Sequence, residues 1–177
     1  MLDPHKDVDF EHVFLPHLDS AYNLARWLMR NDADAQDVVQ EAYLRALRFA
    51  HGYRGGDARA WLLAIVRNTA LTWIQRNRRS NEAAEFDEEA HGTCSGADSL
   101  EAAMVRDAEG KAIRAALEAL PIEYREVIVM REIEGLTYKE IADAAELPIG
   151  TVMSRLARAR KRLQNALASL VGRKVTQ

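Results

Sequence analysis

Residues 136–167 contain two helical segments separated by a short turn, which is the pattern of a helix-turn-helix. Thr137 and Glu140 have the spacing of a capping box, which predicts a helix that runs from Thr137 through Ala145. Pro148 cannot continue that helix, because it lacks a backbone N–H and clashes with the preceding turn. A turn must therefore follow, and a second helix opens directly after it.

The second helical segment is apolar on one face and basic on the other. Its apolar residues recur at three- and four-residue steps: Val152, Leu156, Ala159, Leu163, Ala166 and Leu170. Its basic residues are Arg155, Arg158, Arg160, Lys161 and Arg162. From Thr151 to the C-terminus there is no Asp or Glu, so we expect nothing local to neutralise this face, and phosphate would do so. A solvated amphipathic helix is the alternative, but the short capped turn favours docking in the DNA major groove.

A net charge of −3 is unusual for a DNA-binding chain, but the charge is distributed unevenly along the sequence. Residues 1–80 carry a net charge of +1, residues 81–110 carry −8 and residues 111–177 carry +4. The acidic middle part lacks apolar periodicity and has the composition of a flexible connector. We therefore expect an all-α chain of two small helical domains, residues 1–80 and 106–177, joined by a flexible acidic linker at residues 81–105.

Cysteine and histidine usage gives no indication of disulfide or metal chemistry. Cys94 is the only cysteine, so no internal disulfide is possible, and the five histidines lack metal-ligand spacing. No Gly-rich phosphate loop, metal cluster or nucleophile–base pair indicates an enzyme, so we expect no catalysis, no cofactor and no metal. The absence of a signal peptide and of a long apolar run predicts a cytoplasmic chain without direct membrane insertion.

Three helices are predicted in the first domain, each beginning near an aspartate. They are Asp19–Arg30, Asp34–Ala50 and Asp57–Arg79, with Asn31 and Gly52 as stops between them. On the second helix, Asp37, Glu41 and Leu44 lie one turn apart, on an acidic and polar face beside an apolar one. Such a face suits a protein partner, and a solvated face is the alternative.

The third predicted helix changes character along its length. Its expected core residues are Trp61, Leu62, Ile65, Val66 and Leu71. Its second half is polar, aromatic and basic: Asn68, Trp73, Arg76, Arg78 and Arg79. Aromatic rings between cations suit single-stranded nucleic acid, because bases stack on the rings while the backbone follows the charge. For each tryptophan alone, core packing is the competing interpretation, and late cations also suit the helix dipole.

Three motifs follow one another in an order and at a separation that are typical of one family. They are DAQDVVQEAYLRAL, YRGGDARAWLLAIVRNTALTWIQRNRR and LEALPIEYREVIVMREIEGLTYKEIADAAELPIGTVMSRLARARKRL. The first resembles region 2.2, the second regions 2.3 and 2.4, and the third region 4 of the extracytoplasmic-function (ECF, group IV) sigma factors of bacterial RNA polymerase. This resemblance spans nearly the whole chain, without a region 3 domain, as in that group.

The resemblance implies an alternative sigma factor of the stress-response type, monomeric when free. Such a factor binds core RNA polymerase, recognises the minus-35 and minus-ten promoter elements in promoter DNA, and is held silent by an anti-sigma factor. The implied polymerase-binding residues are Asp37, Gln40, Glu41 and Leu44. The implied minus-ten residues are Trp61, Asn68, Arg76, Arg78 and Arg79. The implied minus-35 residues are Arg131, Thr151, Ser154, Arg155, Arg158 and Arg160.

Two residues depart from the family's pattern in region 4. Glu146 stands where glycine is frequent, and Met153 stands where Lys or Arg is common. Because Met153 cannot donate to a guanine edge, it would offer an apolar contact to a thymine methyl group instead.

The remaining alternative is a one-component helix-turn-helix transcriptional regulator with a sensor or dimerisation domain. A regulator of that kind binds duplex DNA alone and as a dimer, whereas a sigma factor needs core polymerase to bind its promoter.

Overall fold

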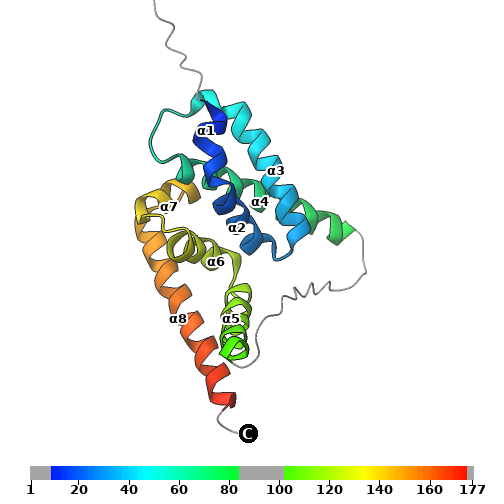
Figure 1. Cartoon of the computed structure of the whole chain (residues 1–177), viewed down its shortest axis with the longest axis vertical. Helices are drawn as coiled ribbons and strands as arrows, with labels where there is room; N and C mark the ends of the chain where they lie inside the picture. Colours follow the sequence, from blue (N-terminus) through cyan, green and yellow to red (C-terminus); the bar gives the residue numbers. More distant parts are fainter. Residues whose placement is uncertain (1–8, 84–101, 175–177) are drawn as a thin grey trace, which may run out of the picture.

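The computed structural model describes residues 9–83 and 102–174, and all regular elements in these ranges are helical (Figure 1). The first domain holds α1 (Phe10–Phe14), α2 (Leu18–Met29), α3 (Asp32–Phe49) and α4 (Ala58–Ala83), with short 3₁₀ turns η1 (Leu15–His17) and η2 (Ala50–Gly52). The second holds α5 (Ala102–Glu118), α6 (Ile122–Ile128), the π-helical η3 (Val129–Ile133), α7 (Tyr138–Ala145) and α8 (Ile149–Lys174). The all-α, two-domain prediction is confirmed.

The helix boundaries of the first domain follow capping groups, not all of them the predicted ones. The side chain of Asn31 accepts a hydrogen bond from the Asp34 amide at 2.8 Å, so Asn31 starts α3 and does not end α2. Arg30 ends α2 in the left-handed region, at φ 66°. Asp57 caps α4 as expected, and the bond from the Ala60 amide lowers the pKa of this carboxyl. Asp19 caps nothing and lies in the first turn of α2.

The core of the first domain forms where α2, α3 and α4 pack against one another. Its largest fully buried side chains are Phe14, Leu24, Leu28, Val38, Leu62, Leu63 and Val66. The prediction for α4 was right for Leu62 and Val66 and missed Leu63. Trp61, Ile65 and Leu71 are only half-buried, because the inward line of α4 runs through residues 62, 63, 66 and 70 and leaves them on its flanks.

The helix-turn-helix of the second domain has the predicted form. Both hydrogen bonds of the Thr137–Glu140 capping box are present at the start of α7. Glu146 ends α7 in the left-handed region, at φ 54°, and the Leu147 amide then bonds the Ala142 carbonyl at 2.9 Å. The Pro148 carbonyl accepts from the Thr151 amide at 2.9 Å, which opens α8. On α8, Val152, Leu156 and Ala159 are buried, as the periodicity predicted.

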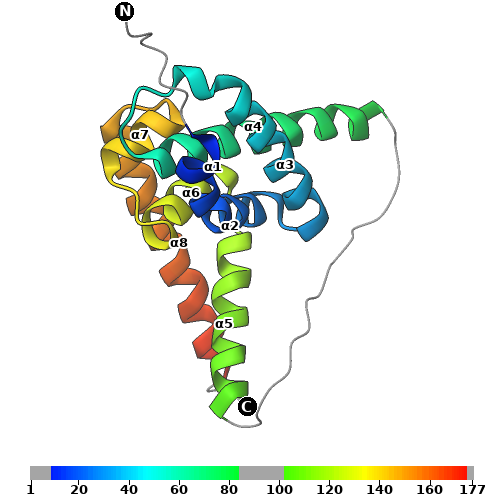
Figure 2. The same cartoon turned by 45° about the horizontal axis from the view of Figure 1, so that its top comes forward.

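The two domains pack directly against each other. Helix α7 lies against α4 and α6 lies against α2, as Figures 1 and 2 show from two directions. The buried apolar residues of both domains belong to one continuous cluster. Helices α4 and α5 also extend into the ends of the predicted linker, while its central part, residues 84–101 with Cys94, lies outside the described residues. Among the described helices, none is long and apolar enough to span a membrane.

Candidate nucleic-acid and polymerase interfaces

The predicted polymerase-binding residues share one face of α3, on the side of the first domain away from α7 and α8 (Figures 1 and 2). Asp37, Gln40 and Leu44 are exposed, and Glu41 is half-buried in an ion pair with Arg45. Exposed Leu47 extends the apolar part of this surface. The sequence interpretation missed it, although Leu47 follows Leu44 by three positions. We call Asp37, Gln40, Glu41, Leu44 and Leu47 the α3 face.

Trp61 lies in an aromatic cluster on the first domain. Its ring centroid is 4.9 Å from that of Phe14 and 5.5 Å from that of Tyr53, and the last two are 5.3 Å apart. Phe14 is fully buried, whereas Trp61 is half-buried. The ring therefore contributes to packing and keeps part of its surface accessible. Core packing therefore describes part of its surroundings, and contact of Trp61 with DNA stays a prediction.

Asn68, the predicted minus-ten residue, is half-buried on α4 and engaged by its neighbour. Its side-chain oxygen accepts a hydrogen bond from Arg67 Nη1 at 2.9 Å. Arg76 and Arg78 are exposed further along the same helix, and Arg79 follows them. The predicted residues thus occur along one helix, with Trp61 near its start.

The first three turns of α8 present a mostly uncharged outer surface. Ile149, Met153, Ser154 and Arg158 are exposed there, while Thr151 is half-buried and its carbonyl accepts from Ser154 Oγ at 3.0 Å. The N-terminal residues of a recognition helix contact base edges in the major groove. Among the four exposed residues, Arg158 carries the positive charge, and it has no ion pair within the described residues.

As expected, α8 carries no carboxylate of its own from Thr151 onward, but carboxylates of α6 and η3 neutralise part of its basic face. Arg155 Nη1 lies 3.0 Å from Glu126 Oε1, and Arg160 Nη2 lies 2.7 Å from Glu132 Oε1. The hydrogen bond with Glu132 raises the pKa of Arg160. Glu126 precedes Arg155 by 29 residues and Glu132 precedes Arg160 by 28, so the pattern of the helix itself does not show either pair.

Arg162 has a partner of another kind. Its guanidinium lies 5.0 Å from the ring centroid of Tyr124, at cation–π distance. Three of the five cations on this face, Arg155, Arg160 and Arg162, are therefore engaged within the second domain.

Arg131, predicted to contact promoter backbone, is also engaged. Its Nη1 donates to the carbonyl oxygen of Leu136 at 2.8 Å, and its guanidinium lies 4.9 Å from the ring centroid of Tyr138. These contacts connect η3 to the start of α7. The structure thus gives Arg131 a packing role that its position in the motif did not reveal.

Glu126 and Arg67 are the site residues that the sequence interpretation missed. Glu126 is buried at 2% exposure and receives hydrogen bonds from Arg67 at 2.8 and 3.3 Å. One signal was available, because Glu126 begins the apolar run EVIVM, where a charged residue needs a partner. The partner itself is 59 residues away and could not be identified from spacing.

Comparison with known proteins gives matches along both domains. Residues 13–80 match the family described as Sigma-70 region 2, and residues 110–163 match Sigma-70, region 4. The RNA polymerase sigma-H factor of Pseudomonas aeruginosa is 35% identical over 170 residues, which cover 92% of this chain and 88% of that protein. The ECF RNA polymerase sigma-E factor of Escherichia coli K12 is 33% identical over 147 residues, covering 79% and 77%.

A solved structure supports the same assignment. The sigma factor RpoE of Bartonella quintana, crystallised with the anti-sigma factor NepR, matches with a TM-score of 0.73 and 27% identity, over 90% of this chain and 97% of that chain. Similarity thus extends over both domains in sequence and in fold. The chain belongs to the sigma-70 family and, within it, to the extracytoplasmic-function sigma factors.

Proposed function

We propose that this protein is an alternative sigma factor that acts in the cytoplasm, directs core RNA polymerase to a set of promoters and performs no catalysis of its own. The observation that carries the proposal is the presence of both promoter-binding domains in one chain, with region 2 and region 4 in order. A one-component regulator requires a helix-turn-helix but does not require a region 2 domain. The chemistry of RNA synthesis belongs to the polymerase.

The α3 face is the proposed polymerase-binding surface. It combines exposed apolar side chains, Leu44 and Leu47, with the carboxylates of Asp37 and Glu41. Burying the leucines supplies binding free energy, while the carboxylates give orientation and steer the encounter. This surface is on α3, whereas the proposed DNA-binding residues lie on α4 and α8, so polymerase and DNA can be bound together.

The proposed promoter contacts divide between the two domains. Asn68 and the cations of α4 would hold an unstacked base and the backbone of the minus-ten strand. The outer surface of α8, with Met153, Ser154 and Arg158, would read the minus-35 element in the major groove. One domain thereby captures opened DNA while the other fixes the register upstream.

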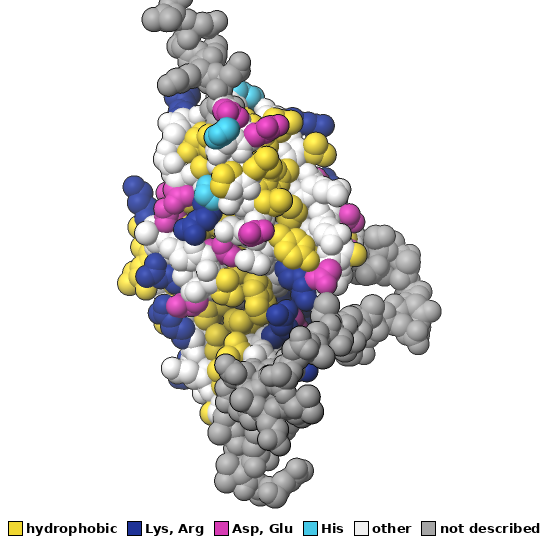
Figure 3. All heavy atoms as spheres, in the orientation of Figure 1, with side chains coloured by type: hydrophobic (Ala, Val, Ile, Leu, Met, Phe, Trp, Pro, Cys, Tyr) yellow, Lys and Arg dark blue, Asp and Glu magenta, His cyan; other side chains and the backbone are white. Residues whose placement is uncertain are grey.

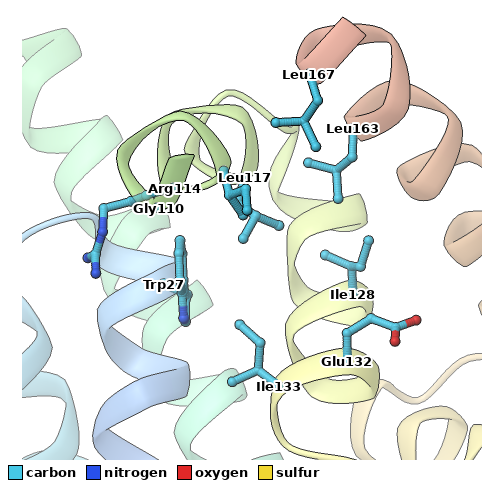
Figure 4. A pocket seen from close by; sticks show the side chains of 10 residues that line it. Trp27, Gly110, Arg114, Leu117, Ile128, Glu132, Ile133, Leu163 and Leu167 are labelled. Carbon is cyan, nitrogen blue, oxygen red and sulfur yellow. The ribbon is translucent and has the colours of Figure 1, made fainter. Parts of the chain in front are cut away.

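An apolar groove is the proposed docking site for an anti-sigma factor (Figure 4). It is lined mainly by Trp27, Ile113, Leu117, Ile128, Ile133, Leu163 and Leu167, which come from α2, α5, α6, η3 and α8. Figure 3 shows hydrophobic side chains between α5 and α8 with Lys and Arg on both sides. An amphipathic helix with acidic flanks fits such a groove. The relative RpoE, crystallised with the anti-sigma factor NepR, supports this class of partner.

Run-off transcription with purified core polymerase tests the proposed function. Core polymerase with this protein should open a promoter and start transcripts without ATP hydrolysis, and core polymerase alone should not. Leu44→Asp should weaken holoenzyme assembly, because it places a charge in the apolar part of the α3 face. A protein that binds duplex DNA as a dimer and never associates with core polymerase would be a one-component regulator instead.

A further inference from the structure

Glu126 joins the two domains through a buried carboxylate. Arg67 of α4 donates from Nε to Glu126 Oε2 at 2.8 Å and from Nη2 to Oε1 at 3.3 Å, and Arg155 of α8 donates to Oε1 at 3.0 Å. The side chain of Glu126 is 2% exposed, that of Arg67 13% and that of Arg155 25%. One carboxylate thus bonds an arginine from each domain.

The same contacts connect the proposed DNA-binding residues of both domains. Arg67 also donates to the side-chain oxygen of Asn68, the proposed minus-ten residue. Arg155 belongs to the proposed minus-35 set. A continuous line of hydrogen bonds therefore runs from Asn68 through Arg67 and Glu126 to Arg155.

This arrangement excludes simultaneous binding of the two promoter elements. Arg67 and Arg155 contact one carboxylate, so the two sites are only one side chain apart. Elements centred near minus-35 and minus-ten are separated by about 25 base pairs, or roughly 85 Å of duplex at about 3.4 Å per base pair. The domains must separate before both elements can be bound.

We infer that Glu126 acts as an internal competitor of promoter phosphate: it holds the free protein closed through Arg67, which is released when the domains separate, and it keeps Arg155 paired within the second domain. The inference rests on the proposed function and adds a regulatory role for a residue outside the promoter-binding set. An arginine–carboxylate pair with two parallel hydrogen bonds has the same geometry that arginine uses on phosphate.

Burial makes this contact suitable for a switch. A buried ion pair contributes little net stability compared with an apolar replacement, but breaking it by removing one partner is costly. The closed form is therefore sensitive to any ligand that offers Arg67 another anion. DNA affinity in the free protein is reduced by the fraction of molecules that are open.

The Arg160–Glu132 pair provides a matched control. It also joins an arginine of α8 to a carboxylate, at 2.7 Å, but both residues belong to the second domain and are about half-exposed. Its loss frees a cation on the recognition helix without affecting the contact between domains.

The test measures domain separation and DNA affinity in the full-length chain. Donor and acceptor dyes are attached at Gln36→Cys on α3 and Asn165→Cys on α8, both exposed positions, in a Cys94→Ser background. Energy transfer is compared for wild type, Glu126→Gln, Arg67→Gln and the control Glu132→Gln. The DNA probe is a duplex that carries both the minus-35 and the minus-ten elements of a promoter that the protein transcribes in the run-off assay. Circular dichroism confirms that each variant is folded.

Glu126→Gln and Arg67→Gln should each lower energy transfer and raise the affinity of the free chain for the duplex by about threefold or more, with Glu132→Gln unchanged in transfer. Arg67→Gln is decisive, because it leaves the Glu126–Arg155 pair within the second domain intact. If only Glu126→Gln raises affinity, or if both variants stay closed, the inference is overturned. Domain separation is measured without DNA, so failure of the inference can be distinguished from failure of the proposed function.

Discussion

Arg131 Nη1 lies 2.8 Å from the carbonyl oxygen of Leu136, and this bond closes the turn between η3 and α7. Leu136 is fully buried. Without Arg131 the carbonyl loses this donor at a place where the chain reverses direction before the helix-turn-helix. The residue that the family pattern assigns to DNA is thus also part of the domain's framework.

Arg131→Ala should lower the free energy of unfolding by about 1–3 kcal/mol, because a buried carbonyl loses its hydrogen-bond donor. Chemical denaturation followed by circular dichroism measures the change. Lys161→Ala, which removes an exposed cation of α8, should change stability little and serves as the control. Unaltered stability together with weaker promoter binding would contradict the structural role.

The raised pKa of Tyr43 should make the protein less stable at alkaline pH. Its hydroxyl donates to the Phe14 carbonyl at 2.9 Å, and burial, assisted by the charge of Asp19, raises its pKa to about 12. Since the folded-state pKa exceeds the unfolded value of about 10, this contribution is complete below pH 10 and is lost as the pH rises through 12.

Tyr43→Phe should lower stability by about 1 kcal/mol at neutral pH through the lost hydrogen bond and should remove this part of the alkaline dependence. Thermal melts from pH 8 to 12 test both effects. Tyr53→Phe, which removes a more exposed hydroxyl bonded to Gly56, should keep the alkaline loss. An identical pH profile for wild type and Tyr43→Phe would exclude Tyr43 as its source.

Replacing Glu146 with glycine should stabilise the turn of the helix-turn-helix. Its φ of 54° is unfavourable for a side chain with a Cβ, by about 1–2 kcal/mol, and glycine adopts it without that strain. Part of the gain is offset by the greater freedom of glycine in the unfolded chain. Glu146→Gly should therefore raise the free energy of unfolding by up to about 1 kcal/mol, and Glu146→Ala should not. A less stable glycine variant would show that the Glu146 side chain itself contributes to the turn.

Arg158 is exposed on the outer surface of α8 and has no ion pair in the part of the chain that the structure describes. Arg158→Ala should weaken holoenzyme binding to promoter DNA by about 1–3 kcal/mol, through loss of a base or phosphate contact. Binding to core polymerase should stay the same, since the α3 face is unaltered. Arg162→Ala, whose guanidinium stacks on Tyr124, is the comparison and should have a smaller effect on DNA. Loss of core binding in a folded Arg158→Ala protein would mean that the surface is wrongly assigned.

Asn68 is expected to act in promoter opening more than in folding. Asn68→Ala removes the acceptor for Arg67 Nη1 but leaves the Arg67–Glu126 pair in place, so thermal stability should change little. Open-complex formation on a duplex promoter, followed by permanganate reactivity of unpaired thymines, should decrease. A large drop in melting temperature with normal opening per folded molecule would make the residue structural.

Local patterns predicted much of this protein, because they depend on residues within a few positions of one another. The capping box at Thr137, the turn at Pro148 and the buried line through Val152 and Leu156 follow from helix geometry alone. The order of three motifs identified the family, which the comparisons confirm. The cap of α3 was assigned incorrectly because Asn31 and Asp34 both have side chains suited to a cap, and only backbone geometry distinguishes them.

Tertiary packing alone decided which charges meet and which surfaces remain available. No residue near Arg155 or Arg160 in the sequence was expected to neutralise them, and α6 and η3 place Glu126 and Glu132 beside them from 28 or 29 residues away. Arg67 reaches Glu126 across the domain boundary, and Trp27 lines the groove with side chains of the second domain. The sequence shows that a buried carboxylate needs a cation, but packing selects the partner, since charge pairing depends on distance in space and not along the chain.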